Sequence, residues 1–167
     1  MNSRLRDLFK LSERRSKLSM FSLELCKLVM NHKFTVVDFD KSEKIQKLIS
    51  QNLKNSQKKC LTFFSTPFHS KELLETVLSC INQVNKDCVY IGIGLSEQCG
   101  YARLDSIMDF NTQFNYLDES TGIINFYSCD IENELIIDFY DEDEVWYYDL
   151  EIRGDNWTSS IENITSN

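Results

Sequence analysis

The glycine pair Gly92-Ile93-Gly94 begins like the turn with which many proteins bind nucleotides. In that turn, three glycines at fixed spacing let the backbone approach a phosphate at the start of a helix. Here Glu97 stands where the third glycine is needed, and no helical pattern begins after it. We therefore interpret the two glycines as the end of a strand and expect no cofactor.

Cys99 is the residue that could act as a nucleophile. A catalytic thiolate needs a base, usually a histidine, within hydrogen-bonding reach. The chain has two histidines, His32 and His69, and neither lies near Cys99 in the sequence or near a set of Cys or acidic residues at metal-ligand spacing. We expect Cys99 to be a buried or loop thiol, His69 to lie at the start of a helix, and no metal to be bound.

Four consecutive carboxylates, Asp141-Glu142-Asp143-Glu144, could hold a hard cation or supply a catalytic acid pair. A calcium loop, however, alternates its ligands and has a glycine at its sharp turn, and this run has neither feature. We expect an exposed turn here. These weak signatures predict that the chain is not an enzyme.

The acidic turn joins two of three segments that alternate like strands. Residues 122–129, 134–140 and 145–153 are separated by short polar turns, which predicts an antiparallel meander. Successive side chains of a strand point to opposite sides, so the two faces can be separated. The expected core face consists of Ile124, Phe126, Leu135, Ile137, Phe139, Trp146, Tyr148, Leu150 and Ile152.

The opposite face of the meander is both acidic and aromatic, and it has no Lys or Arg before Arg153. Tyrosines contribute rigid contact area and carboxylates contribute charge complementarity, a combination typical of surfaces that bind a basic partner. The alternatives are a merely solvated face, or a face that the basic N-terminal helices cover internally. The predicted contact residues are Tyr127, Asp138, Tyr140, Asp141, Glu142, Asp143, Glu144, Tyr147, Asp149 and Glu151.

Charge is divided unevenly along the chain. Residues 1–60 hold 14 basic and 6 acidic side chains, whereas residues 61–167 hold 4 and 20, giving the net charge of -8. The basic residues form no Arg-rich stripe with interleaved aromatics, and the whole chain would be repelled by phosphate, so we expect no direct nucleic-acid binding. The acidic surface instead favours association with a basic protein.

Upstream of the meander, helical periodicity alternates with short apolar runs, and one compact domain is expected. Together with the meander this predicts an α+β fold, in which N-terminal helices pack on a mainly antiparallel sheet. The domain should span residues 1–157, with a disordered tail over 158–167, and residues 95–121 are left unassigned. The expected elements are a helix over 3–30 with a break at residues 16–19, a strand over 34–39, a helix capped by Asp40, a strand over 60–64, a helix over 73–84 and a buried strand over 88–94.

The six cysteines form no CxxC pair and no short-loop framework, which indicates reduced thiols in a cytoplasmic protein whose fold survives reducing agents. No apolar run approaches the length of a membrane span, so no membrane association is expected. The oligomeric state stays open.

The segment from Ile136 to Gly154, which is rich in acidic and aromatic residues, resembles the endings of bacterial immunity proteins of contact-dependent growth inhibition and related polymorphic toxin systems. The resemblance is one of pattern and carries over no individual residue. It implies a cytoplasmic protein that binds the toxin domain of a delivered effector, often a basic nuclease, and neutralises it by steric and electrostatic occlusion. Two alternatives remain: an acidic chaperone for a secreted effector, and an enzyme of unrecognised type.

Overall fold

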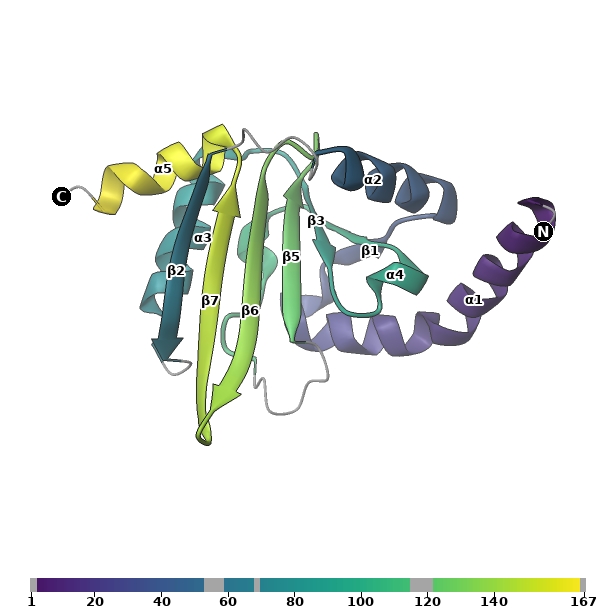
Figure 1. Cartoon of the computed structure of the whole chain (residues 1–167), viewed down its shortest axis with the longest axis horizontal. Coiled ribbons are helices and arrows are strands. Elements are labelled where there is room, and N and C mark those ends of the chain that lie inside the picture. The colour runs from purple at the N-terminus through teal and green to yellow at the C-terminus, as the bar shows by residue number, and fades with distance from the viewer. Residues whose placement is uncertain (1–2, 53–58, 68–69, 115–121, 166–167) are drawn as a thin grey trace.

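The computed structural model describes residues 3–52, 59–67, 70–114 and 122–165, and it shows the predicted α+β fold (Figure 1). The elements are α1 (Ser3–Leu28), η1 (Met30–His32), β1 (Phe34–Val36), α2 (Phe39–Asn52), β2 (Cys60–Pro67), α3 (Glu72–Val84), β3 (Val89–Gly92), α4 (Ser96–Cys99), β4 (Ala102–Leu104), η2 (Ile107–Asp109), β5 (Ile123–Ser128), β6 (Glu134–Glu142), β7 (Val145–Arg153) and α5 (Asp155–Thr165).

The strands form one seven-stranded antiparallel sheet in the order β1-β4-β3-β5-β6-β7-β2. The meander β5-β6-β7 is confirmed. Its second turn is a two-residue hairpin, because Asp143 and Glu144 both have positive φ, the backbone form that matches the twist of the flanking strands. Strand β2 lies far from the meander in sequence, yet it occupies the edge beside β7 (Figure 1).

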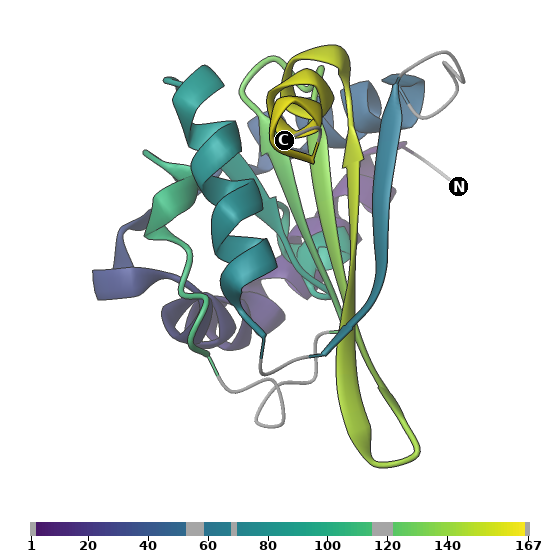
Figure 2. The same ribbon diagram turned by 90° about the vertical axis from the view of Figure 1, so that its left-hand side faces the viewer.

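The main core lies on the side of the sheet that carries α1, α3 and α5 (Figure 2). Every residue of the expected core face is buried there except Trp146, which is only partly buried. Helix α3 buries an apolar stripe of Leu74, Val77, Leu78 and Ile81 against the strands, as its three- and four-residue spacing requires. The opposite side of the sheet is called the outer side below.

Helix α2 covers only one part of the outer side. Its Ile45 and Ile49 pack with Tyr90, Tyr101 and Tyr127 in a second, smaller cluster over β3 and β5. The outer side of β6, β7 and β2 has no described helix over it, as Figures 1 and 2 show. The basic N-terminal helices therefore do not cover the acidic strands.

Strand β3 has all four residues buried, which confirms a strand covered on both faces. The neighbouring segment, which the sequence leaves unassigned, supplies β4 between β3 and β1. An added Cβ on Gly92 would lie 3.1 Å from the Tyr101 ring, so the close approach of this ring explains the glycine.

The predicted break in the first helix is wrong. Helix α1 continues through residues 16–19, and the serines do not interrupt it: Ser16 and Ser22 donate their hydroxyl groups to backbone carbonyls of the preceding turn. Such bonds often bend a helix, and α1 is visibly curved in Figure 1. Among the described residues, no helix combines the length and the apolar character needed to cross a bilayer.

The start of the second helix lies slightly earlier than predicted. The carboxylate of Asp38 accepts a hydrogen bond from the Lys41 backbone N–H at 2.8 Å, and α2 begins at Phe39. Asp38 is therefore the cap, and Asp40 lies in the first turn, where its charge favours the helix dipole.

The prediction of a disordered tail is also wrong for residues 158–165, and residues 166–167 lie outside the described residues. Residues 155–165 form helix α5, and Trp157 and Ile161 are buried in the main core. Thr158 donates its hydroxyl group to the Gly154 carbonyl at 2.8 Å and is fully buried. The described domain therefore extends to residue 165.

The cysteines correct a further expectation. Cys88, just before β3, and Cys129, just after β5, form a disulfide across 41 residues of sequence. The free thiols of the described residues are Cys26, Cys60, Cys80 and Cys99. The expectation that all six cysteines are reduced is therefore not met by this structure.

Candidate functional site

The exposed part of the β6–β7 hairpin brings together most of the predicted contact residues. Strand register places Ile136 opposite Glu151, Asp138 opposite Asp149 and Tyr140 opposite Tyr147. We call these six residues the hairpin face. All six are partly exposed on the outer side, so strand alternation produces the predicted surface.

The acidic turn lies at the tip of the same hairpin. Asp141, Glu142, Asp143 and Glu144 are all exposed. Asp141 pairs with Trp146 and so belongs to the core side by alternation, but the strands reach past the packed helices at this point (Figure 2). The tip therefore offers carboxylates on both sides of the sheet.

Tyr127 does not belong to this surface. It is only 5% exposed, and its ring lies edge-on to Tyr101 with 5.9 Å between the ring centroids. Burial, followed by the nearby Glu134, raises the pKa of Tyr127 far above its usual value. Tyr127 does point to the outer side of the sheet, as alternation along the strand predicts. Helix α2, however, covers this end of β5, and no local signal in the sequence indicates that cover.

Tyr140, Tyr147 and Asp149 form a fixed cluster at the end of the hairpin face nearest to the turn. The two tyrosine rings stack at 5.9 Å between centroids, with 26° between their planes. The Tyr140 hydroxyl donates to Asp149 at 3.1 Å, and the backbone N–H of Ser65 donates to the same carboxylate oxygen at 2.7 Å. Side chains held in this way lose little entropy when a partner binds.

Asp138 lies beside this cluster in an unfavourable electrostatic position. Burial, followed by the charge of Asp149, raises the pKa of the Asp138 carboxyl above its usual value. On its other side, Asp138 pairs with Ile123, whose side chain is 47% exposed. A Lys or Arg side chain of a partner could therefore bind between the two carboxylates of Asp138 and Asp149, beside the exposed apolar side chain of Ile123.

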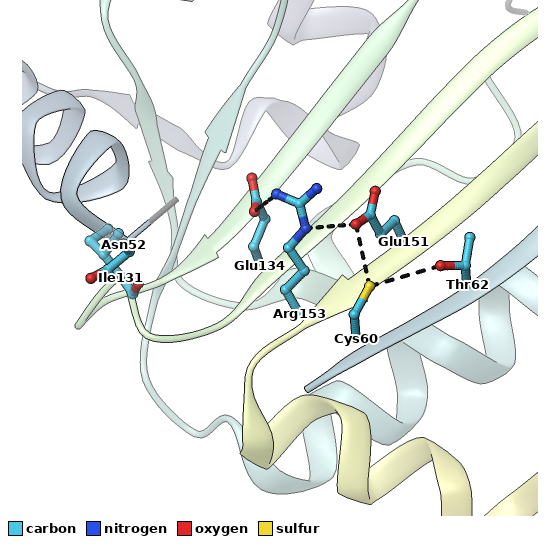
Figure 3. A network of polar contacts seen from close by, with 7 residues as sticks. All are labelled: Asn52, Cys60, Thr62, Ile131, Glu134, Glu151 and Arg153. Atoms are coloured by element: carbon cyan, nitrogen blue, oxygen red, sulfur yellow. Dashed lines mark hydrogen bonds and ion pairs between the residues drawn. The ribbon is translucent and has the colours of Figure 1, made fainter. Parts of the chain in front are cut away.

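Glu151 is engaged within the protein (Figure 3). Arg153 donates from Nε to Glu151 at 2.6 Å and from Nη1 to Glu134 at 3.2 Å. Cys60 donates its thiol to the same Glu151 oxygen at 3.3 Å. Although burial opposes it, the hydrogen bonds from Arg153 and Cys60 hold the pKa of Glu151 below its usual value. Glu151 is thus partly neutralised and contributes less free charge than the sequence suggests.

Two residues of β2 extend the surface and were not predicted. Ser65 bonds Asp149, and Phe64 is 73% exposed. Phe64 directly precedes Ser65 at the register shift between Phe63 and Thr66, so it lies next to this surface. No local signal could have identified these residues, because their place depends on the pairing of β2 with β7.

The residues considered for catalysis do not assemble in the described part of the chain. Cys99 is fully buried, and burial raises the pKa of its thiol, which disfavours the thiolate. His69 lies outside the described residues. Within the described ranges, no group of three or more His, Cys, Asp or Glu side chains is placed to hold a metal ion.

Comparison with protein-family models, with curated proteins and with solved structures finds no match to this chain. The function must therefore be inferred from the surface itself.

Proposed function

We propose that this chain is a cytoplasmic immunity protein that binds a basic toxin domain through the hairpin face and the acidic tip. The observation that carries the proposal is the outer side of β6 and β7, which no described helix covers and on which stacked tyrosines and carboxylates lie together. Binding there would neutralise the toxin by steric and electrostatic occlusion.

Three properties of this surface support a protein partner. Tyr140 and Tyr147 offer rigid aromatic area of the kind that dominates interface energy. Burial and the charge of Asp149 disfavour the ionised form of Asp138, and a partner's Lys or Arg would stabilise it. Phe64 and Ile123 add exposed apolar area at the flanks.

We expect a large secreted toxin to be encoded directly upstream of this chain's gene, and the test uses the C-terminal domain of that toxin. The double variant Tyr147→Ala/Asp149→Ala should stay folded, at a cost of about 1–2 kcal/mol, because both side chains are partly exposed. Its affinity for the toxin domain, measured by calorimetry, should fall by about 2 kcal/mol or more, and protection of cells should be lost.

Asp105→Ala is the matched control, because its side chain is 88% exposed and lies on the loop after β4, away from the hairpin face. This variant should bind with unchanged affinity. A folded double variant that binds as tightly as the wild type would overturn the proposal, and so would a gene neighbourhood without any secreted toxin.

A further inference from the structure

Strand β2 is the edge strand beside β7, and within the described residues no strand pairs with its other side. An exposed edge offers unpaired backbone N–H and C=O groups to another chain. Most natural edges are protected by charged side chains, by Pro or by bulges.

The hydrogen-bond pattern shows which groups of β2 face the free edge. Gly154 donates its N–H to the Lys59 carbonyl at 3.0 Å, so residues 59 and 154 form a hydrogen-bonded pair. In an antiparallel ladder such pairs alternate with pairs whose backbone groups point away. Leu61 and Phe63 therefore bond to β7, whereas Cys60 and Thr62 direct their N–H and C=O groups to the free edge.

This edge is uncharged and only partly protected. The strand sequence from Cys60 to Pro67 contains no charged residue. Its protective features, the register shift between Phe63 and Thr66 and the proline at position 67, both lie in its second half. The first half is a regular strand with open backbone groups.

The side chains of the first half are incompletely covered. Leu61 and Phe63 pack against the main core but are only partly buried, and Phe64 is largely exposed. Helix α5 extends past β2 on the side of the sheet that carries α3, as Figures 1 and 2 show. A strand added beside β2 would therefore lie under existing helical cover.

We propose that β2 pairs with β2 of a second copy of this chain, antiparallel and centred on Thr62. In this register the two Thr62 residues face each other across a twofold axis and exchange both backbone hydrogen bonds. Each Leu61 lies opposite the other copy's Phe63, so each copy covers the partly exposed core residues of the other. The two seven-stranded sheets become one continuous sheet.

Charge favours a second copy over a basic strand. The acidic groups nearest to the edge are already engaged, Glu151 by Arg153 and Asp149 by Ser65 and Tyr140. Near the start of β2, Lys59 pairs with Glu162. A neutral, self-complementary edge suits a copy of itself, and the two hairpin faces stay accessible on the same side of the joined sheet.

The experiment uses the full chain alone, so its outcome does not depend on the proposed toxin binding. Sedimentation velocity up to about 0.5 mM should show a concentration-dependent dimer of modest affinity, because a single strand pair buries little area. Amide exchange at Thr62 should slow as the concentration rises, whereas the already bonded Leu61 amide should change little.

Three substitutions at one position test the register. Thr62→Pro removes the edge-facing N–H, and Thr62→Lys places two like charges opposite each other at the axis, so each should weaken the dimer at least about tenfold. Thr62→Val is the matched control, because it keeps the backbone and the strand preference and should keep the dimer.

A monomer at every concentration would overturn the proposal. A dimer that survives both Thr62→Pro and Thr62→Lys would also overturn it, since the copies would then meet through another surface. If Thr62→Pro fails to fold, Thr62→Lys decides, because its added side chain lies on the outer side and leaves the ladder to β7 intact.

Discussion

Asp138 and Asp149 lie directly opposite each other on β6 and β7, with both carboxylates on the outer side of the sheet, where no described helix covers these two strands (Figure 2). Like charges in this position destabilise a strand pair. Asp149 is partly compensated by the bonds from Ser65 and Tyr140, whereas the pKa of Asp138 is raised. A cationic group of a partner would therefore stabilise the ionised form of Asp138 in the folded protein.

Asp138→Asn should make the protein more stable near neutral pH. A raised pKa means that ionisation of Asp138 destabilises the folded state, a penalty that is absent below the carboxyl's pKa in the unfolded chain and complete above its folded pKa. The variant should gain on the order of 0.5 kcal/mol at pH 7 and nothing at about pH 3. Urea unfolding at both pH values measures the difference, and a variant less stable at pH 7 would contradict the electrostatic assignment.

Association with the toxin domain should depend on salt. If the hairpin face steers a basic partner, the association rate should fall several-fold between about 50 and 500 mM salt, because screening shortens the range of the field. Stopped-flow kinetics measure this rate. A rate that is indifferent to salt would remove electrostatic steering while leaving open a purely steric mode of binding.

Glu144→Gly should stabilise the hairpin. Asp143 and Glu144 have φ values of 52° and 65°, a left-handed conformation that costs energy for a residue with a side chain. Asp-Gly is the preferred sequence for this turn, so the variant should gain about 1 kcal/mol in free energy of unfolding. A loss of stability in thermal unfolding would show that the turn is formed differently.

The two tryptophans should differ in their effect on stability. Trp157 is 1% exposed, so Trp157→Ala should cost about 3–5 kcal/mol through a core cavity. Trp146 lies opposite the exposed Asp141 and is only partly buried, so Trp146→Ala should cost less, about 1–2 kcal/mol. Denaturant unfolding measures both losses of stability. If Trp146→Ala cost more than Trp157→Ala, the place of α5 in the core would be contradicted.

Reduction should lower the thermal stability of the oxidised protein. Cys88 and Cys129 are 41 positions apart in the sequence, and their bond closes the loop between them. The entropy that the unfolded chain loses through such a loop corresponds to about 4 kcal/mol of stabilisation. The double variant Cys88→Ser/Cys129→Ser should lose this stability and become insensitive to dithiothreitol, whereas Cys60→Ser should keep the sensitivity. Wild-type protein indifferent to dithiothreitol would restore the expectation of reduced thiols.

The sequence by itself determined the elements whose signals are local. The meander and its two faces follow from alternation, and the stripe of α3 follows from three- and four-residue spacing, because these periods determine which side chains share a face. The fully buried β3 follows from a continuous apolar run. The α+β class follows from the order of these elements.

Only the tertiary structure decided which elements meet. The place of β2 beside β7, which brings Phe64 and Ser65 to the hairpin face, depends on pairing between segments far apart in sequence. The same holds for the cover that α2 gives Tyr127, for the burial of Trp157 of α5 in the main core and for the bond between Cys88 and Cys129. Local periodicity shows which face of a helix or strand must be buried against another element. Which element covers that face depends on the packing of the whole chain, and a local pattern does not contain this information.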